Sequence, residues 1–151
     1  MACRNPQKAA EAQSNIAGDT VIECVDLGDL ASIREFIQRA QAAYPAVEGL
    51  INNAGTMMTP FGLTKDGIEL QFGTNHIGHF ALTAGLMPSL IAGKAARVVS
   101  VSSVAHRRGK LKYKTMNEKR SYNKIKAYAA SKLANLVFMF ELSRRLTTKG
   151  I

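Results

Sequence analysis

The chain has 151 residues, of which 46% are hydrophobic and 21% are charged. Lys and Arg number 20 against 11 Asp and Glu, which gives a formal net charge of +9. This length and composition suit one domain with a core and exclude wholesale disorder. Two cysteines are too few for a disulfide framework, no apolar run is long enough to span a bilayer, and the N-terminus has no apolar signal region. A secreted, collagenous or membrane-spanning protein is therefore not expected. A cytoplasmic location is the default expectation, and an anchor upstream of Met1 is left open.

Helical and strand-like segments alternate from the N-terminus. Residues 6–16 are alanine-rich and predict a short helix, and residues 20–27 are β-branched and predict a strand. Asp29 or Ser32 is expected to cap the next helix, which Pro45 ends. Its apolar positions recur at helical spacing: Ile33, Phe36, Ile37 and Ala40.

The pattern continues through the second half of the chain. Residues 47–52 and 97–102 predict strands, and residues 64–92 predict a long helix. Its candidate buried positions are Ile68, Leu70, Phe72, Ile77, Phe80 and Leu86. A last helix runs to Lys149 and Gly150, with an apolar stripe at Ala129, Leu133, Leu136, Val137 and Phe140.

Strands that alternate with helices imply parallel crossovers, and hence an α/β fold whose sheet carries helices on both faces. The apolar character of the strands agrees, because parallel strands are buried on both sides. The sequence shows no internal repeat and no linker. Residues 1–151 are therefore expected to form a single domain.

Polar side chains follow two of the predicted strands. Asn52, Asn53, Ala54 and Gly55 end the strand over residues 47–52. Ligands of open parallel sheets bind beyond the carboxyl ends of the strands, and small residues there let a flat ligand approach the backbone. An ordinary turn is the alternative, because Asn and Gly are common turn formers. Ser102 and Ser103 end the next strand, and such serines are often only helix caps.

Tyr128 and Lys132 open the last helix four residues apart, on one helical face. An ammonium beside a phenol favours the phenolate, which makes the phenol usable as a general acid or base near neutral pH. Tyr122 and Lys126 have the same spacing. We favour Tyr128, because the apolar stripe behind it pins its helix to the core, whereas the earlier pair lies in a charged loop.

Asn75 interrupts the predicted long helix. Asn and the nearby glycines are poor residues for a helix interior, so either the helix is distorted there or Asn75 lies on a polar face. A distortion would free a backbone carbonyl to hold water. His76 and His79 are three residues apart, but no third ligand at a convincing spacing accompanies them. We therefore expect packing roles for both rings rather than a metal site.

The positive charge is concentrated in residues 107–126, where only Glu118 is acidic. The basic residues of this segment are Arg107, Arg108, Lys110, Lys112, Lys114, Lys119, Arg120, Lys124 and Lys126. A solvated loop is the favoured interpretation. The alternative is a module that binds nucleic acid or an anionic membrane, with Tyr113 and Tyr122 stacking on bases. No nucleic-acid partner is expected under the favoured interpretation.

Six segments jointly resemble the short-chain dehydrogenase/reductase family, and most nearly its retinol-dehydrogenase-like group. They occur in the family's order and span nearly the whole chain: residues 2–4, 25–27, 50–55, 73–80, 97–103 and 128–135. The resemblance implies a partial Rossmann-like, doubly wound parallel sheet. It also implies an enzyme that transfers a hydride between a nicotinamide and a small alcohol or carbonyl substrate.

The resemblance also implies four catalytic roles. Tyr128 would exchange the proton with the substrate oxygen. Lys132 would promote ionisation of that phenol and hold the nicotinamide ribose. Ser103, rather than Ser102, matches the serine that hydrogen-bonds the reacting oxygen. Asn75 matches the asparagine whose main-chain carbonyl holds a relay water.

The cofactor implied by the resemblance is a nicotinamide dinucleotide. Its expected contacts, besides Tyr128 and Lys132, are Asp26 and Leu27 at the adenine and Asn53, Ala54 and Gly55 along the groove. Arg4 matches the position that grips a 2′-phosphate. A guanidinium suits that phosphate, so NADP is expected and NAD is less favoured.

The sequence departs from the family's pattern at both ends. No glycine-rich phosphate-binding turn precedes Arg4, so the family's central first strand is missing and the sheet is expected to have a gap with unpaired edges. The family's sixth strand would only begin at residues 150–151. The chain is therefore expected to be a truncated, internal piece of a larger enzyme that binds NADP poorly and has little activity by itself.

Two modes of association follow. A non-catalytic fragment could act by pairing its exposed strand edges with another chain. Homo-oligomers could form through residues 64–92 and 128–149, because members of the family often associate through these two helices.

Overall fold

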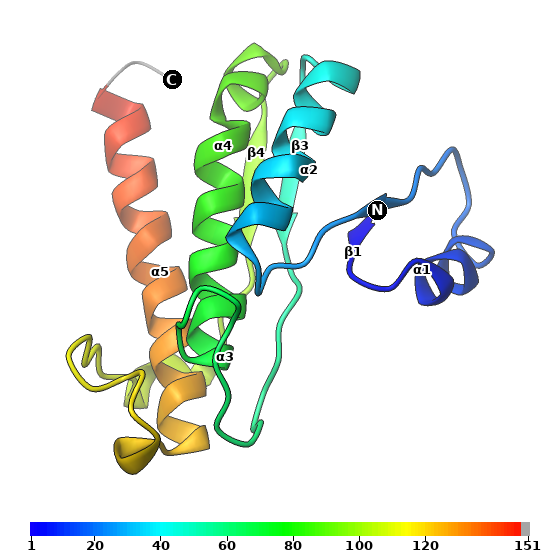
Figure 1. The fold of residues 1–151 in the computed structure, drawn as a ribbon. Helices are drawn as coiled ribbons and strands as arrows, with labels where there is room; N and C mark the ends of the chain where they lie inside the picture. Colours follow the sequence, from blue (N-terminus) through cyan, green and yellow to red (C-terminus); the bar gives the residue numbers. More distant parts are fainter. Residues whose placement is uncertain (149–151) are drawn as a thin grey trace.

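The computed structural model describes residues 1–148, in which short parallel strands alternate with helices (Figure 1). The elements are β1 (Ala2–Cys3), α1 (Pro6–Gln13), β2 (Glu23–Cys24), α2 (Leu30–Ala43), β3 (Gly49–Asn52), α3 (Leu70–Phe72), the π-helical segment η1 (Gly73–Ile77), α4 (Gly78–Ala92), β4 (Arg97–Ser100), the 3₁₀ turns η2 (Val104–Arg108) and η3 (Lys119–Ser121), and α5 (Lys124–Thr148). The predicted helix end at Lys149 and Gly150, and the strand start at residues 150–151, lie outside the described residues.

The strands form two separate parallel pairs, β1 with β2 and β3 with β4. In the second pair Asn52 stands opposite Ser100, so the segments that follow β3 and β4 leave the sheet at the same edge. Within residues 1–148 no ladder joins β1 to β3. The parallel α/β class is confirmed, and the expected gap lies between the two pairs.

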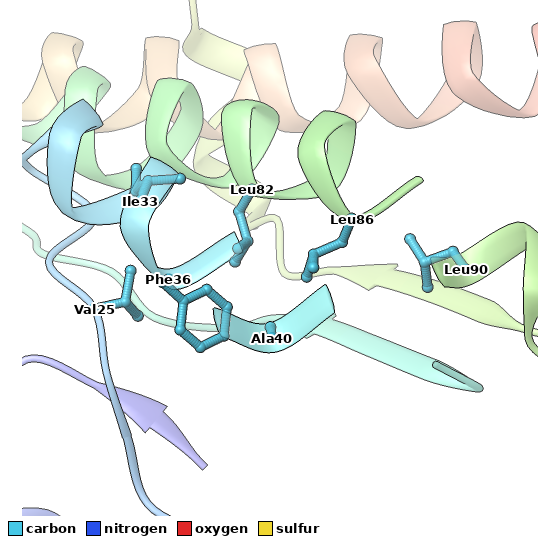
Figure 2. Close-up of a cluster of buried hydrophobic side chains, with 7 residues drawn as sticks. All are labelled: Val25, Ile33, Phe36, Ala40, Leu82, Leu86 and Leu90. Carbon is cyan, nitrogen blue, oxygen red and sulfur yellow. The ribbon is translucent and has the colours of Figure 1, made fainter. Parts of the chain in front are cut away.

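The main core joins the two strand pairs through α2 and α4 (Figure 2). Its buried members are Val25, Ile33, Phe36, Ala40, Leu82, Leu86 and Leu90. Leu50 of β3 and Val98 of β4 pack against this cluster, so α2 and α4 cover one face of that pair. Ile51 on the opposite face is 69% exposed, and Val99 is exposed as well. The sequence predicted helices on both faces of the sheet, but at these positions of β3 and β4 the second face is uncovered within residues 1–148.

Local signals define α2 well. The Asp29 carboxylate caps it by accepting the backbone N–H groups of Ala31 and Ser32. The helix ends at Ala43, two residues before Pro45, because the residue preceding a proline is pushed out of the helical conformation. Of its predicted core positions, Ile37 is only partly buried.

The prediction of one helix over residues 64–92 is wrong in its first turns. Residues 64–69 form a turn in which the backbone N–H of Thr64 donates to the carbonyl of Ile68. Gly67 supplies the positive φ of 75° that this turn requires. The Glu69 carboxylate then caps α3 through the N–H groups of Gln71 and Phe72.

Other boundaries and burial assignments also need correction. The strand predicted over residues 20–27 is reduced to β2, because β1 offers only two residues to pair with it. The strand predicted over residues 97–102 stops at Ser100, where the ladder with β3 ends. Phe80, Val137 and Phe140 were predicted to be buried, yet each is exposed, and Phe140 is 70% exposed. Phe80 contacts Phe138 at the junction of α4 and α5, yet within the described residues nothing covers the outer side of this face.

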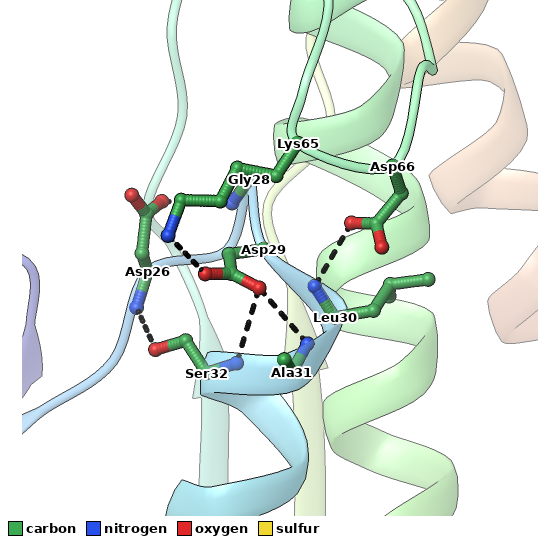
Figure 3. A network of polar contacts seen from close by, with 8 residues as sticks. All are labelled: Asp26, Gly28, Asp29, Leu30, Ala31, Ser32, Lys65 and Asp66. Carbon is green, nitrogen blue, oxygen red and sulfur yellow. Dashed lines mark hydrogen bonds and ion pairs between the residues drawn. The ribbon is translucent and has the colours of Figure 1, made fainter.

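A polar network at the start of α2 ties that helix to the turn over residues 64–69 (Figure 3). The Lys65 ammonium donates to the Asp29 carboxylate at 2.5 Å, and the backbone N–H of Leu30 donates to Asp66 at 2.9 Å. The Lys65 contact, followed by the cap bond from Ser32, holds the pKa of Asp29 below its ordinary value. This network fixes the loop that leads into the π-helical segment.

Asp29→Asn should lower the urea midpoint of unfolding at neutral pH. The amide oxygen can still cap the helix, but the negative charge that pairs with the Lys65 ammonium is lost. A lowered carboxyl pKa stabilises the fold above the unfolded value and loses that effect as the pH falls through the folded value. The difference between variant and parent should therefore begin to shrink below about pH 4 and close only after the pH has fallen through the lower pKa of the folded state. It should also shrink in salt, because the Lys65 side chain is exposed. A difference that does not change between neutral and acidic pH would contradict the ion-pair explanation.

Candidate active site

Tyr128 and Lys132 lie on one face of the first half of α5. The Lys132 Nζ lies 5.7 Å from the centroid of the Tyr128 ring, over its face. A spacing of four residues brings the two side chains together on a helix. The structure therefore brings the sequence-predicted phenol and ammonium together.

Lys132 is held in place at the sheet edge. Its residue is only 4% exposed, and its Nζ donates to the backbone carbonyl of Val101 at 2.9 Å. Burial lowers the pKa of this ammonium. The Ser102 hydroxyl donates to the Lys132 carbonyl, and so ties the segment after β4 to α5 from the other side.

Asn75 lies in η1, so the helix is distorted there, as the sequence suggested. The N–H of the capping residue Gly78 bonds to the carbonyl of Gly73, five residues back. The Asn75 side chain is fully buried and makes three hydrogen bonds. Its Oδ1 accepts the N–H of Thr56, and its Nδ2 donates to the carbonyl of Thr56 and to the Ser131 hydroxyl. One side chain thus joins the loop after β3, η1 and α5.

Gly55 completes this cluster. A Cβ at this position would stand 3.2 Å from Asn75 Oδ1 and 3.9 Å from Lys132 Nζ. The loop after β3 therefore passes close beside both side chains, which a larger residue would crowd. Asn53 and Ala54 precede it and are exposed at the same edge.

Ser103 caps η2 and is partly buried. Its hydroxyl oxygen accepts the N–H of Ala105 at 3.2 Å, which leaves the hydroxyl hydrogen free to donate. Its carbonyl accepts from His106 Nδ1. η2 packs on α5, since a Cβ at Gly109 would meet the carbonyl of Ala129.

The residues expected at the adenine end lie on the first strand pair. Arg4 follows β1, is exposed and forms no ion pair within residues 1–148. Asp26 follows β2, and its carboxylate accepts the N–H of Gly28. Leu27 packs against Gly78, where a Cβ would collide with the Leu27 carbonyl. These residues therefore belong to a different strand pair from Asn53, Ala54 and Gly55.

Tyr122 differs from Tyr128 in its surroundings. It lies before α5, which begins at Lys124, so Tyr122 and Lys126 are not a pair on one helical face. Its hydroxyl donates to the carbonyl of Thr59 at 2.7 Å and accepts from Gln71 Nε2 at 2.8 Å. These bonds give Tyr122 a structural role between the loop after β3 and α3.

The basic segment borders a cavity of about 290 Å³ between α3, the loop after η2 and the start of α5. Its cationic lining residues are Arg108, Lys110, Lys112 and Lys126, and none of them forms an ion pair within residues 1–148. Glu69 also lines the cavity, and burial raises the pKa of its carboxyl. Neither Tyr128 nor Lys132 lines it. Binding of an anionic partner by this segment stays a prediction.

Sequence reasoning missed the residues that bind the Asn75 side chain, and for His76 and His79 it predicted only packing roles. Thr56 and Ser131 bind Asn75 from distant parts of the chain, so no local spacing identifies them. His79 is buried, its Nδ1 lies 2.9 Å from the Asn75 carbonyl, and burial lowers the pKa of its ring. His76 Nδ1 lies 3.1 Å from Asn135 Oδ1. The four-residue spacing of Asn75 and His79 could have indicated the former contact.

Comparison with known proteins identifies the family of the chain. The family model described as short chain dehydrogenase matches residues 1–151. The chain belongs to the short chain dehydrogenase family. It is 43% identical to retinol dehydrogenase 12 of Mus musculus and 43% identical to retinol dehydrogenase 13 of Homo sapiens, with all of this chain covered in both alignments. It covers 49% and 47% of those two proteins, so it spans about half the length of the curated relatives it matches.

Solved structures of similar fold include a protein from Mycobacterium paratuberculosis, with a TM-score of 0.89 and 45% identity. That alignment covers 99% of this short chain dehydrogenase and 53% of the other chain. A short chain dehydrogenase of Shigella flexneri complexed with NADP gives a TM-score of 0.73 at 23% identity, over 97% of this chain and 60% of that one. The second comparison bears on the fold alone. Within residues 1–148 every helix is too short or too polar to cross a membrane.

Asn75→Ala should destabilise this short chain dehydrogenase by about 1–3 kcal/mol, because it removes three hydrogen bonds of a fully buried side chain, to partly buried Thr56 and buried Ser131. Urea unfolding followed by circular dichroism measures the change. Asn53→Ala is the matched control, since Asn53 is exposed, and it should change stability by less than about 0.5 kcal/mol. Equal effects of the two substitutions would contradict the joining role assigned to Asn75.

Proposed function

We propose that this chain provides the catalytic half of an NADP(H)-dependent oxidoreductase that interconverts alcohol and carbonyl groups. The observation that carries the proposal is the convergence of Tyr128, Lys132, Asn75 and Gly55 at one edge of the β3–β4 pair. A buried ammonium over a phenol ring is a suitable arrangement for proton transfer. The family membership and the retinol dehydrogenase relatives support the same reaction class.

The residues present fit one end of a nicotinamide cofactor. At the sheet edge the backbone of Gly55 lies open, and a Cβ there would fill the space beside Asn75 and Lys132. Lys132 uses one N–H on Val101 and has two left, which suit ribose hydroxyls. When bound, the cofactor supplies or accepts the hydride.

Proton movement is then assigned to three residues of this chain. The Tyr128 hydroxyl donates a proton to the substrate carbonyl oxygen in reduction and recovers it in oxidation. The free hydroxyl hydrogen of Ser103 donates to the same oxygen and orients it. The Asn75 carbonyl accepts from His79 Nδ1 but has a second lone pair, with which it holds a relay water near Lys132.

Tyr128→Phe should lower kcat by about 10²- to 10⁴-fold, because it removes the proton donor and leaves the ring. The assay is the NADPH-dependent reduction of small aldehydes and retinaldehyde. The protein assayed is a chimera in which residues 1–151 replace the matching half of mouse retinol dehydrogenase 12. Tyr122→Phe is the control, and it should change thermal stability more than kcat, since its hydroxyl binds Thr59 and Gln71. Loss of activity in Tyr122→Phe alone would reverse the assignment.

We also propose NADP rather than NAD, with Arg4 on the 2′-phosphate. The guanidinium is exposed and free of an ion pair within the described part of the chain, so it is available for a charge-assisted bond. Arg4→Ala in the same chimera should raise KM for NADPH by about 10- to 100-fold and leave KM for NADH nearly unchanged. Lys8→Ala, on the exposed side of α1, should alter neither value. Equal effects of Arg4→Ala on both cofactors would contradict this role.

Self-association through α4 and α5 is a further part of the proposal. Phe80 and Phe138 contact each other edge to face, with ring centroids 5.2 Å apart, so the two helices form one continuous surface. Exposed Val137 and Phe140 extend it. An apolar surface of this kind is typical of a protein–protein interface, and its occupant here is proposed to be a second copy of this chain.

A further inference from the structure

The two cysteines of the chain stand opposite each other on paired strands. Cys3 of β1 and Cys24 of β2 are register partners in a parallel ladder, next to the pair formed by Ala2 and Glu23. Both thiols are free. They come from positions 21 residues apart in sequence, with α1 in the connection between them, so only the fold brings them together.

The spacing of the strands suits a disulfide. Neighbouring strands lie about 4.7–4.9 Å apart, and the Cα atoms of disulfide-bonded cysteines are usually about 4.4–6.8 Å apart. Register partners also project from the same face of a sheet. The Cys3 Sγ lies 4.0 Å from the carbonyl oxygen of Glu23, so this thiol already extends across to β2.

The surroundings of the pair permit reaction and a small adjustment. Cys24 is exposed and Cys3 is partly buried, so a reagent in solution meets Cys24 first. Each strand is only two residues long, and within residues 1–148 no further strand pairs with this ribbon. The Cβ atoms must approach to about 3.5–4.5 Å, and a short ribbon yields more easily than a central strand.

We propose that Cys3 and Cys24 form a reversible dithiol–disulfide site, with a glutathione-type disulfide as the co-reactant. The Cys24 thiolate attacks one sulfur of the glutathione disulfide, which forms a mixed disulfide and releases one glutathione thiolate. The Cys3 thiolate then attacks the Cys24 sulfur, which forms the internal bond and releases the second glutathione thiolate. The protein loses two electrons and two protons in total, and the glutathione disulfide is reduced to two thiols.

The bond would link the two strands that precede Arg4 and Asp26. Arg4 follows Cys3 directly, and Asp26 lies two residues after Cys24. Oxidation would therefore fix the spacing of these two segments. The site itself rests only on the β1–β2 register and is independent of the proposed catalytic function.

The test uses the complete chain, equilibrated in glutathione buffers of graded oxidised-to-reduced ratio and quenched with acid. Intact mass and peptide mapping quantify the internal bond. Held by the fold, the pair should form it with an equilibrium constant at least about tenfold larger than the same chain in denaturant, where only chain flexibility brings the thiols together. Cys3→Ser should leave a glutathione adduct on Cys24.

A relocated thiol provides the matched control. In Ala2→Cys/Cys3→Ser the cysteine moves by one position and projects from the opposite face of β1, while the loop to Cys24 changes by one residue. In this variant the equilibrium constant for the internal disulfide should be about the same in the folded chain as in denaturant. Equal constants for the parent chain in the two conditions would overturn the proposal. So would stable glutathione adducts on both cysteines without an internal bond, or bonds formed only between chains.

Discussion

The arrangement of the site depends on the hydrogen bonds of one buried amide. Asn75 binds both backbone groups of Thr56 and the hydroxyl of Ser131, and it thereby fixes the loop after β3 against α5. In a regular α-helix this side chain would point in a different direction, so the π-helical segment is needed to aim it at Thr56 and Ser131. Because Gly55 lies beside Asn75, loss of these bonds would release the loop edge next to Lys132, whose ammonium is held separately by the Val101 carbonyl.

Local features could be predicted from the sequence, and long-range ones could not. The Asp29 cap, the buried Ile33 and Phe36, and the pairing of Tyr128 with Lys132 all follow from spacings of a few residues. The distortion at Asn75 was one of two alternatives that the nearby glycines suggested, but its partner Ser131 lies 56 residues away. Phe140 is exposed because burial depends on what covers a helix face, which apolar spacing along one helix does not specify.

The separation of the strands into two pairs divides the proposed cofactor residues. Arg4 and Asp26 follow β1 and β2, whereas Asn53 and Gly55 follow β3. No ladder within residues 1–148 connects the pairs. Their relative position rests on the packing of Val25 against the α2–α4 core (Figure 2) and on hydrogen bonds that join α2 to the β2 segment, from Arg39 to the Cys24 carbonyl and from the Asp26 N–H to Ser32. Non-directional apolar contacts specify position less sharply than a ladder of backbone hydrogen bonds. The two ends of the proposed dinucleotide site are therefore joined through α2 and the core, and not through a common strand ladder.

The two faces of α5 separate the basic segment from the buried ammonium. Tyr128 and Lys132 face the sheet edge, whereas Lys126 and Ala130 face the cavity that Arg108 and Lys110 border. Burial already lowers the pKa of Lys132, and further cations close to it would lower that pKa more. In the proposed function this ammonium must stay charged to favour a phenolate, and other cations close to it would oppose that. The helix body, packed on Gly109 and Phe72, keeps the basic residues that line the cavity on the side away from the phenol.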